Sequence, residues 1–233
     1  MTESDAGTIH SQAEQARERG DFTEALKLTE DAFAAYNSEG NGAKAAEVLA
    51  SKTLTLRHLY EQTGDISYLD QAKEEARRSV QVATASGVGG ATILPRYNLA
   101  KVLETSGELE EATGVMEGVV DDMMKNPPEE LKRPSVKAEM EVRLATFEYR
   151  GGDKSALERA EKSLSDLEAA DEPDEYARDV WVSGGHMKIA AMLVEDDPAK
   201  AKEHLEKARA IIDGNPKLTL RRAQFEKLSQ SFS

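Results

Sequence analysis

The amino-acid sequence predicts an all-α protein: an α-solenoid of about five antiparallel helix pairs followed by a C-terminal capping helix. Three observations predict it. A short turn motif recurs about every 44 residues along the whole chain. Apolar residues at helical spacing stand before and after each motif, and the alternation typical of strands is absent.

The recurring motif is a Gly-Asp or Gly-Glu pair, or an Asp-Asp pair in its place, followed by an alanine. Glycine adopts the left-handed backbone that ends one helix, and an acidic side chain can cap the next helix by accepting from its free N–H groups. The segments 64–72 and 152–160 are identical at five of nine positions, which indicates an internal duplication. The five motifs are Gly20-Asp21, Gly64-Asp65, Gly107-Glu108, Gly152-Asp153 and Asp196-Asp197, and in the fourth either Gly151 or Gly152 could be the turn residue.

Each motif separates two helical patterns of one repeat. Leu49, Leu56 and Tyr60 show the spacing before a turn, and Ala25, Leu28 and Ala32 show it after one. Segments rich in Gly, Pro and Asn stop the helices between repeats. We therefore expect one domain, 1–233, with first helices at 3–19, 42–63, 91–106, 132–150 and 174–195, second helices with their turns at 21–37, 65–86, 107–126, 153–172 and 196–213, and repeats at about 3–40, 41–88, 89–130, 131–172 and 173–213.

A last helix is expected from about 217 to 231, within a cap that covers 214–233. It has Leu218, Leu220 and Phe225 on an apolar side, and Arg221 and Arg222 among its polar residues. Solenoids need such a polar-backed helix at the end of the stack.

Two of the turns, Gly20-Asp21-Phe22-Thr23-Glu24-Ala25 and Gly107-Glu108-Leu109-Glu110-Glu111-Ala112, resemble the inter-helix signature of the tetratricopeptide repeat (TPR) family. The sequence departs from that family in its period, which is about 44 instead of about 34, and in lacking the first-helix tryptophan. HEAT-like and armadillo-like solenoids therefore stay open as alternatives. The TPR resemblance implies a right-handed superhelix whose first helices line a concave groove for an extended peptide or a partner's helix.

Composition excludes several other classes. The chain has 44 acidic and 30 basic residues, a formal charge of −14 and no cysteine. Broad nucleic-acid binding needs clustered Lys and Arg, so it is not expected. Thiolate metal sites and disulfides are excluded. No apolar stretch reaches the length of a membrane helix, and the acidic N-terminus is unlike a signal peptide. We expect a cytoplasmic protein with no membrane partner.

Charge is divided unequally between the two kinds of helix. The charges of the five first helices cancel, whereas the second helices carry the negative excess. One interpretation is that the second helices form an acidic outer face exposed to solvent. A more specific interpretation is that the middle three first helices form a mildly basic groove. Such a groove would favour a partner with acidic side chains or a C-terminal carboxylate.

Counting back from each turn by the groove positions of the TPR family selects candidate partner-binding residues. Each could also be an ordinary exposed or inter-repeat residue. The pattern by which chaperone-binding members hold a terminal carboxylate is not matched. The candidates are Leu54, His58, Glu61, Tyr97, Lys101, Glu104 and Tyr149, and Arg143 joins them as a basic residue of the groove.

No pattern of a catalytic, metal or cofactor site is present. The four histidines are far apart in sequence, and Asp196, Asp197 and His204 are interpreted as two helix-capping acids and a surface histidine. Gly184 and Gly185, inside an expected helix, predict a close approach by a neighbouring repeat. The predicted function is a non-enzymatic scaffold or adaptor that binds a peptide segment or partner protein; the alternative is a sensor module that responds to a small peptide or metabolite.

Overall fold

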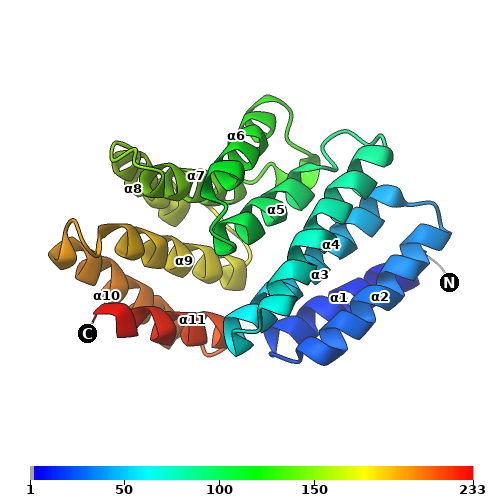
Figure 1. Ribbon diagram of the computed structural model, residues 1–233, viewed down its shortest axis with the longest axis horizontal. Helices are drawn as coiled ribbons and strands as arrows, with labels where there is room; N and C mark the ends of the chain where they lie inside the picture. Colours follow the sequence, from blue (N-terminus) through cyan, green and yellow to red (C-terminus); the bar gives the residue numbers. More distant parts are fainter. Residues whose placement is uncertain (1–2, 233) are drawn as a thin grey trace. The chain divides into compact units, whose positions relative to one another are not determined.

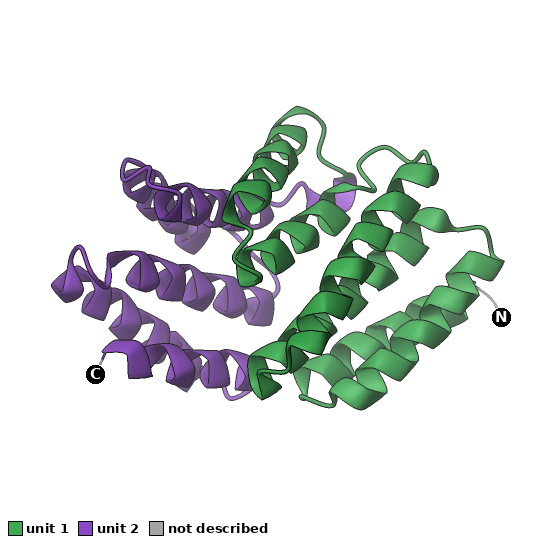
Figure 2. Ribbon diagram, in the orientation of Figure 1, with its two compact units in different colours: residues 1–128 green, residues 129–233 purple. Residues whose placement is uncertain are grey.

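The computed structural model describes residues 3–232, and within them it contains eleven α-helices, two short 3-10 helices and no strand (Figure 1). The all-α prediction is confirmed. The chain divides into two compact units, Met1–Pro128 and Glu129–Ser233 (Figure 2). The boundary lies in the Pro-rich segment that the sequence marks as a break between the third and fourth repeats.

Unit 1 contains three helix pairs. Each helix begins and ends within a few residues of its predicted bounds. The helices are α1 (Glu3–Glu18), α2 (Phe22–Ser38), α3 (Gly42–Thr63), α4 (Ile66–Ala85), α5 (Ile93–Thr105) and α6 (Leu109–Lys125).

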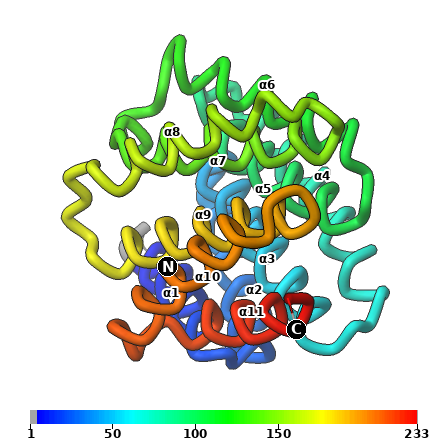
Figure 3. The backbone as a smooth tube through the Cα atoms, turned by 90° about the vertical axis from the view of Figure 1, so that its left-hand side faces the viewer, coloured from blue at the N-terminus to red at the C-terminus, as the bar shows by residue number. Residues whose placement is uncertain are grey.

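Unit 2 contains two further pairs and the last helix, which can be followed along the backbone in Figure 3. Its α11 is shorter than the expected segment 217–231. The elements are η1 (Glu129–Leu131), α7 (Pro134–Arg150), α8 (Ala156–Ala169), α9 (Glu175–Leu193), α10 (Pro198–Gly214), α11 (Thr219–Ser229) and η2 (Gln230–Phe232).

The turns inside the pairs form as the motif predicts. Gly20, Gly64, Gly107 and Gly152 all have positive φ, so Gly152 and not Gly151 is the left-handed residue of the fourth turn. Asp21, Asp65 and Asp197 cap α2, α4 and α10 by accepting from backbone N–H groups at 2.9 to 3.2 Å.

The Gly-Glu turn is an exception to side-chain capping. Glu108 precedes α6, but its carboxylate makes no capping hydrogen bond. It accepts instead from Lys73 Nζ of α4 at 2.8 Å, and this contact lowers the pKa of Glu108. The Glu108 side chain thus reaches the neighbouring pair instead of its own helix.

Each unit stacks its pairs through neighbouring helices. In unit 1, α3 contacts α1, α2, α4 and α5, and α5 also contacts α4 and α6. A buried cluster of Leu56, Leu69, Ala72 and Val102 joins the second pair to the third. In unit 2, α9 contacts α7, α8, α10 and α11. The core is therefore a series of shared layers between successive helices, as expected of a helical repeat.

The last helix covers the end of unit 2 as predicted. Phe225 of α11 and Leu218 just before it are buried in one cluster with Met187 of α9 and Leu205 of α10. Met187 fills this core, and Met123 and Met192 are likewise buried, whereas Met124 is 57% exposed. Within residues 3–232 no helix combines the length and apolar content needed to cross a membrane.

Candidate interaction surfaces

The first candidate surface is the face of α3 that carries Leu54, His58 and Glu61. These residues are spaced by one helical turn, so they lie on the same side of the helix. All three are half-buried. Arg57 Nε lies 3.5 Å from Glu61 Oε1, and the His58 ring lies 6.2 Å from that of Phe22 in α2. The structure therefore brings these three candidates together, with ionic and aromatic neighbours beside them.

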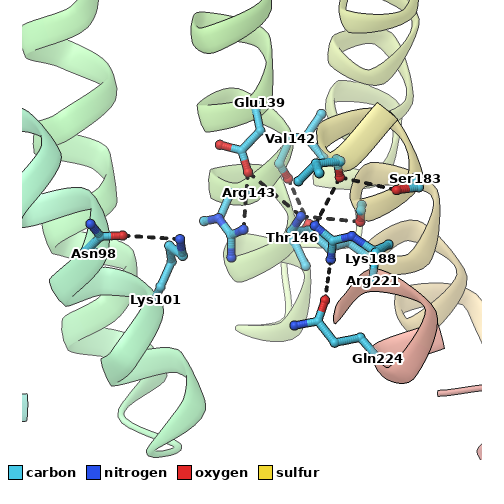
Figure 4. A network of polar contacts seen from close by, with 12 residues as sticks. Asn98, Lys101, Glu139, Val142, Arg143, Thr146, Ser183, Lys188, Arg221 and Gln224 are labelled. Carbon is cyan, nitrogen blue, oxygen red and sulfur yellow. Dashed lines mark hydrogen bonds and ion pairs between the residues drawn. The ribbon is translucent and has the colours of Figure 1, made fainter. Parts of the chain in front are cut away.

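The face of α5 carries the next group of candidates. Lys101 is only 9% exposed, whereas Tyr97 and Glu104 are half-buried. The Lys101 ammonium donates to Asn98 Oδ1 at 3.2 Å (Figure 4). It also lies 4.9 Å from the Tyr97 ring centroid. Asn98 also donates to the Ala50 carbonyl of α3 at 3.4 Å. Asn98, which the groove count did not select, thus connects the α3 and α5 faces and positions Lys101.

In unit 2, the candidate Arg143 of α7 is 8% exposed and forms an ion pair with Glu139, at 3.2 Å between Nη2 and Oε1. The carboxylate of Glu139 also lies 3.9 Å from the ammonium of Lys188 in α9. Lys188 donates to the Gly184 carbonyl at 3.3 Å. Glu139 therefore lies between two cations from neighbouring first helices.

The same first-helix stack continues to α11. Arg221 donates to the Val180 carbonyl of α9 at 3.0 Å and to the side chain of Gln224 at 2.7 Å (Figure 4). We call Glu139, Arg143, Lys188 and Arg221 the basic cluster; it has three cations and one carboxylate. Of these four residues, the sequence predicts only Arg143 as a candidate. The four-residue spacing of Glu139 and Arg143 could have indicated their pair, but nothing local signals Lys188 or Arg221.

Tyr149, the last candidate, occupies a different setting. It is 5% exposed, and its hydroxyl donates to Asp196 in the turn between α9 and α10. Lys154 lies 4.0 Å from the Tyr149 ring centroid and 2.5 Å from Asp196. Burial and the neighbouring Asp196 raise the pKa of Tyr149. Tyr149 connects the fourth pair to the fifth.

His204 is 8% exposed, so its interpretation as a surface histidine is wrong. It packs against His186 of α9, 18 residues away in sequence. Asp197 caps α10 as predicted, while Asp196 binds Tyr149 and Lys154. Among residues 3–232, no group of three His, Asp or Glu side chains is arranged to hold a metal ion.

Sequence comparison gives no relative: no protein-family model matches the chain, and no curated protein does. Solved structures do match. A putative kinesin light chain with nearly identical TPR-like repeats from Podosopora anserina has a TM-score of 0.58 at 19% identity, over 89% of this chain and 95% of that one. BtubC from P. vanneervenii has a TM-score of 0.59 at 18% identity, over 93% and 79%.

A third similar structure is a Rap protein complexed with competence and sporulation factor. It has a TM-score of 0.62 at 11% identity, over 98% of this chain and 65% of that chain. At these identities the likeness concerns the fold. It confirms the TPR-like helical-repeat fold that the turn motifs predict.

Proposed function

We propose that this chain, which has a TPR-like helical-repeat fold, is a non-enzymatic scaffold or adaptor that binds a peptide segment or partner protein on its first-helix faces. The basic cluster carries this proposal. Two of its cations, Arg143 of α7 and Lys188 of α9, lie beside the Glu139 carboxylate, and the third, Arg221 of α11, binds the α9 backbone, in a chain whose net charge is −14. A local excess of positive charge on an acidic protein favours an anionic ligand at that place.

The chemistry of the cluster favours carboxylates as the recognised groups. Arginine presents a planar fork of N–H donors that matches a carboxylate, and such charge-assisted hydrogen bonds are stronger than neutral ones. On the unit 1 face, Lys101 and the half-buried Tyr97 offer a cation beside an aromatic ring. We infer a partner that presents acidic side chains or a C-terminal carboxylate beside apolar ones.

Peptide binding to the full chain tests the proposal. A fluorescein-labelled peptide with acidic residues and a free C-terminus is titrated by fluorescence anisotropy, next to the same peptide with a C-terminal amide and one with lysines in place of the acids. Lys101→Gln and Arg143→Gln should each weaken binding of the acidic peptide about tenfold and reduce its dependence on salt, because each removes one cation.

Lys162→Gln is the matched control, since Lys162 is exposed on α8, pairs with Asp166 at 2.7 Å and is not one of the candidate residues. Arg143→Lys keeps the charge next to Glu139, so it separates loss of binding from loss of fold. If the peptide binds Lys101→Gln and Arg143→Gln with unchanged affinity and salt dependence, the first-helix faces are not the binding surface.

A sensor module that responds to a small peptide or metabolite is the second candidate. The likeness to a Rap protein with a bound factor favours it. Thermal-shift measurements with a panel of metabolites and short peptides distinguish the two, because a ligand that binds only the folded state raises the melting temperature. Stabilisation by a metabolite supports the sensor, and stabilisation only by longer acidic peptides supports the scaffold.

A further inference from the structure

A groove of about 590 Å³ lies between α10 and α11, and neither the basic cluster nor the other candidate residues line it. Leu205 of α10, Phe225 of α11 and Phe232 of η2 form its apolar part, and Lys202, Glu206 and Arg209 of α10 line it as well. Its volume falls within the range of about 300 to 1,000 Å³ that is typical of ligand sites. We call it the α10–α11 groove.

The apolar part of the groove is preformed. Leu205 and Phe225 are buried members of the core cluster at the end of unit 2, and the half-buried Phe232 packs against the same cluster. The groove therefore borders a packed core, whose side chains are held in place by their neighbours. An apolar side chain could enter this groove without rearrangement of the helices.

The charged part of the groove is basic. Lys202 and Arg209 are exposed on α10 and seven residues apart, which places them on one face about 10 Å apart along the helix axis. The Arg209 guanidinium lies 5.4 Å from the Phe225 ring centroid. Glu206 supplies the one carboxylate among the lining residues.

The surrounding sequence has the same charge. Residues 198–233 contain eight Lys or Arg and four Asp or Glu, whereas the whole chain carries −14. Within residues 3–232, Lys202 and Glu206 make no ion pair. The chain thus reverses its charge at the helices that form the groove, and this reversal selects for an acidic ligand over a basic one.

We propose that the α10–α11 groove is a second binding site, for a short segment of a partner protein that carries apolar side chains between two acidic ones. The apolar side chains contact Leu205, Phe225 and Phe232, and the two carboxylates pair with Lys202 and Arg209. A separation of about 10 Å between the cations is close to the ~9 Å between acidic residues three positions apart in a polyproline II segment, where such residues lie on one side. This site is independent of the first-helix faces.

The test uses the full chain and an eight-residue fluorescein-labelled peptide in which two glutamates, three positions apart, flank a leucine and a phenylalanine. One matched peptide replaces both glutamates with lysine, and another replaces the apolar pair with serine. Fluorescence anisotropy should show at least tenfold tighter binding of the first peptide, because each matched peptide loses one of the two kinds of contact.

Variants assign the binding to the groove. The double variant Lys202→Gln with Arg209→Gln should bind the acidic apolar peptide at least tenfold more weakly, and Glu206→Gln should bind it more tightly because a repelling carboxylate is removed. Phe232→Ala should weaken binding without changing its salt dependence. Lys162→Gln on α8 should leave the affinity unchanged, because Lys162 pairs with Asp166 and does not line the groove.

Several results would overturn the proposal. The proposal is wrong if all three peptides bind with equal affinity, or if the folded double variant binds with unchanged affinity. It is also wrong if the Kd is above about 1 mM for every peptide. Sedimentation equilibrium provides a further test, since self-association that depends on Lys202 and Arg209 would make a second copy of the chain the occupant of the groove.

Discussion

His186 Nδ1 lies 2.9 Å from His204 Nδ1, and the other ring nitrogen of His186 lies 2.9 Å from Glu168 Oε1. The three side chains come from α9, α10 and α8. His186 is 2% exposed. Since the Glu168 carboxylate only accepts, neutral His186 donates to it from Nε2, and its Nδ1 accepts from His204. A single N–H, donated by His204 Nδ1 to His186 Nδ1, therefore lies between the two rings when both histidines are neutral.

This pair predicts a loss of stability in mild acid. Burial, together with the neighbouring His186 ring and the charge of Lys207, lowers the pKa of His204 to about 4. Burial also lowers the pKa of His186, although Glu168 opposes this effect. In the unfolded chain both histidines bind protons near pH 6.5, so the free energy of unfolding decreases as the pH falls from about 6.5 to about 4.

The variant His204→Gln isolates this contribution. Urea unfolding of the wild type and the variant at pH 7, 6, 5 and 4 should show a smaller decrease for the variant. The difference has an upper limit of about 3 kcal/mol, because a shift of one pKa unit corresponds to about 1.4 kcal/mol. Parallel pH profiles would show that His204 protonation does not contribute.

Gly185 of α9 predicts a second effect on stability. A Cβ atom at this position would lie 2.6 Å from Cδ1 of Leu164, which is buried in α8 of the preceding pair. The close approach by a neighbouring repeat, predicted from the sequence, is confirmed. Gly185→Leu should lower the free energy of unfolding by about 1 to 3 kcal/mol, because the core cannot accept the added volume without strain.

Gly114→Ala is the matched control for glycine replacement in a helix. Gly114 lies in α6, and no atom lies within 4 Å of its added Cβ. Alanine should raise stability there by about 0.5 to 1 kcal/mol through helix propensity alone. Thermal unfolding of both variants gives the comparison, and an unaltered melting temperature for Gly185→Leu would contradict the packing explanation.

The helices and turns could be predicted because their signals are local. Gly20, Gly64 and Gly107 end helices through a backbone conformation that glycine adopts without strain, and Asp21 and Asp65 cap the following helices within three residues. The prediction needed no knowledge of tertiary contacts. Glu108 departs from it because its partner, Lys73, belongs to another pair of helices.

The interaction surfaces depend on contacts that the sequence does not display. Lys101 and Arg143 lie on the predicted first helices, but their low exposure and their polar partners follow from packing. His204 was expected on the surface because histidine is polar, yet its position on α10 turns it toward α9. The face that a polar helical residue occupies is fixed by its tertiary neighbours.

The last prediction concerns the fifth turn, where Asp196 takes the place of the turn glycine. Asp196 accepts hydrogen bonds from the Tyr149 hydroxyl and from Lys154, and the Tyr149 ring is buried. Tyr149→Phe removes the hydroxyl and keeps the ring, so it should lower the free energy of unfolding by about 1 to 2 kcal/mol while the packing is preserved.

A double-mutant cycle with Asp196→Ala measures how far the two residues act as a pair. Coupling of about 1 kcal/mol or more in urea unfolding is expected, since each single variant breaks the same hydrogen bond. Simple additivity would mean that the contact contributes nothing to stability. If Tyr149→Phe lowers stability but leaves peptide affinity unchanged, Tyr149 joins the fourth and fifth pairs, and the partner is held by the remaining first-helix residues.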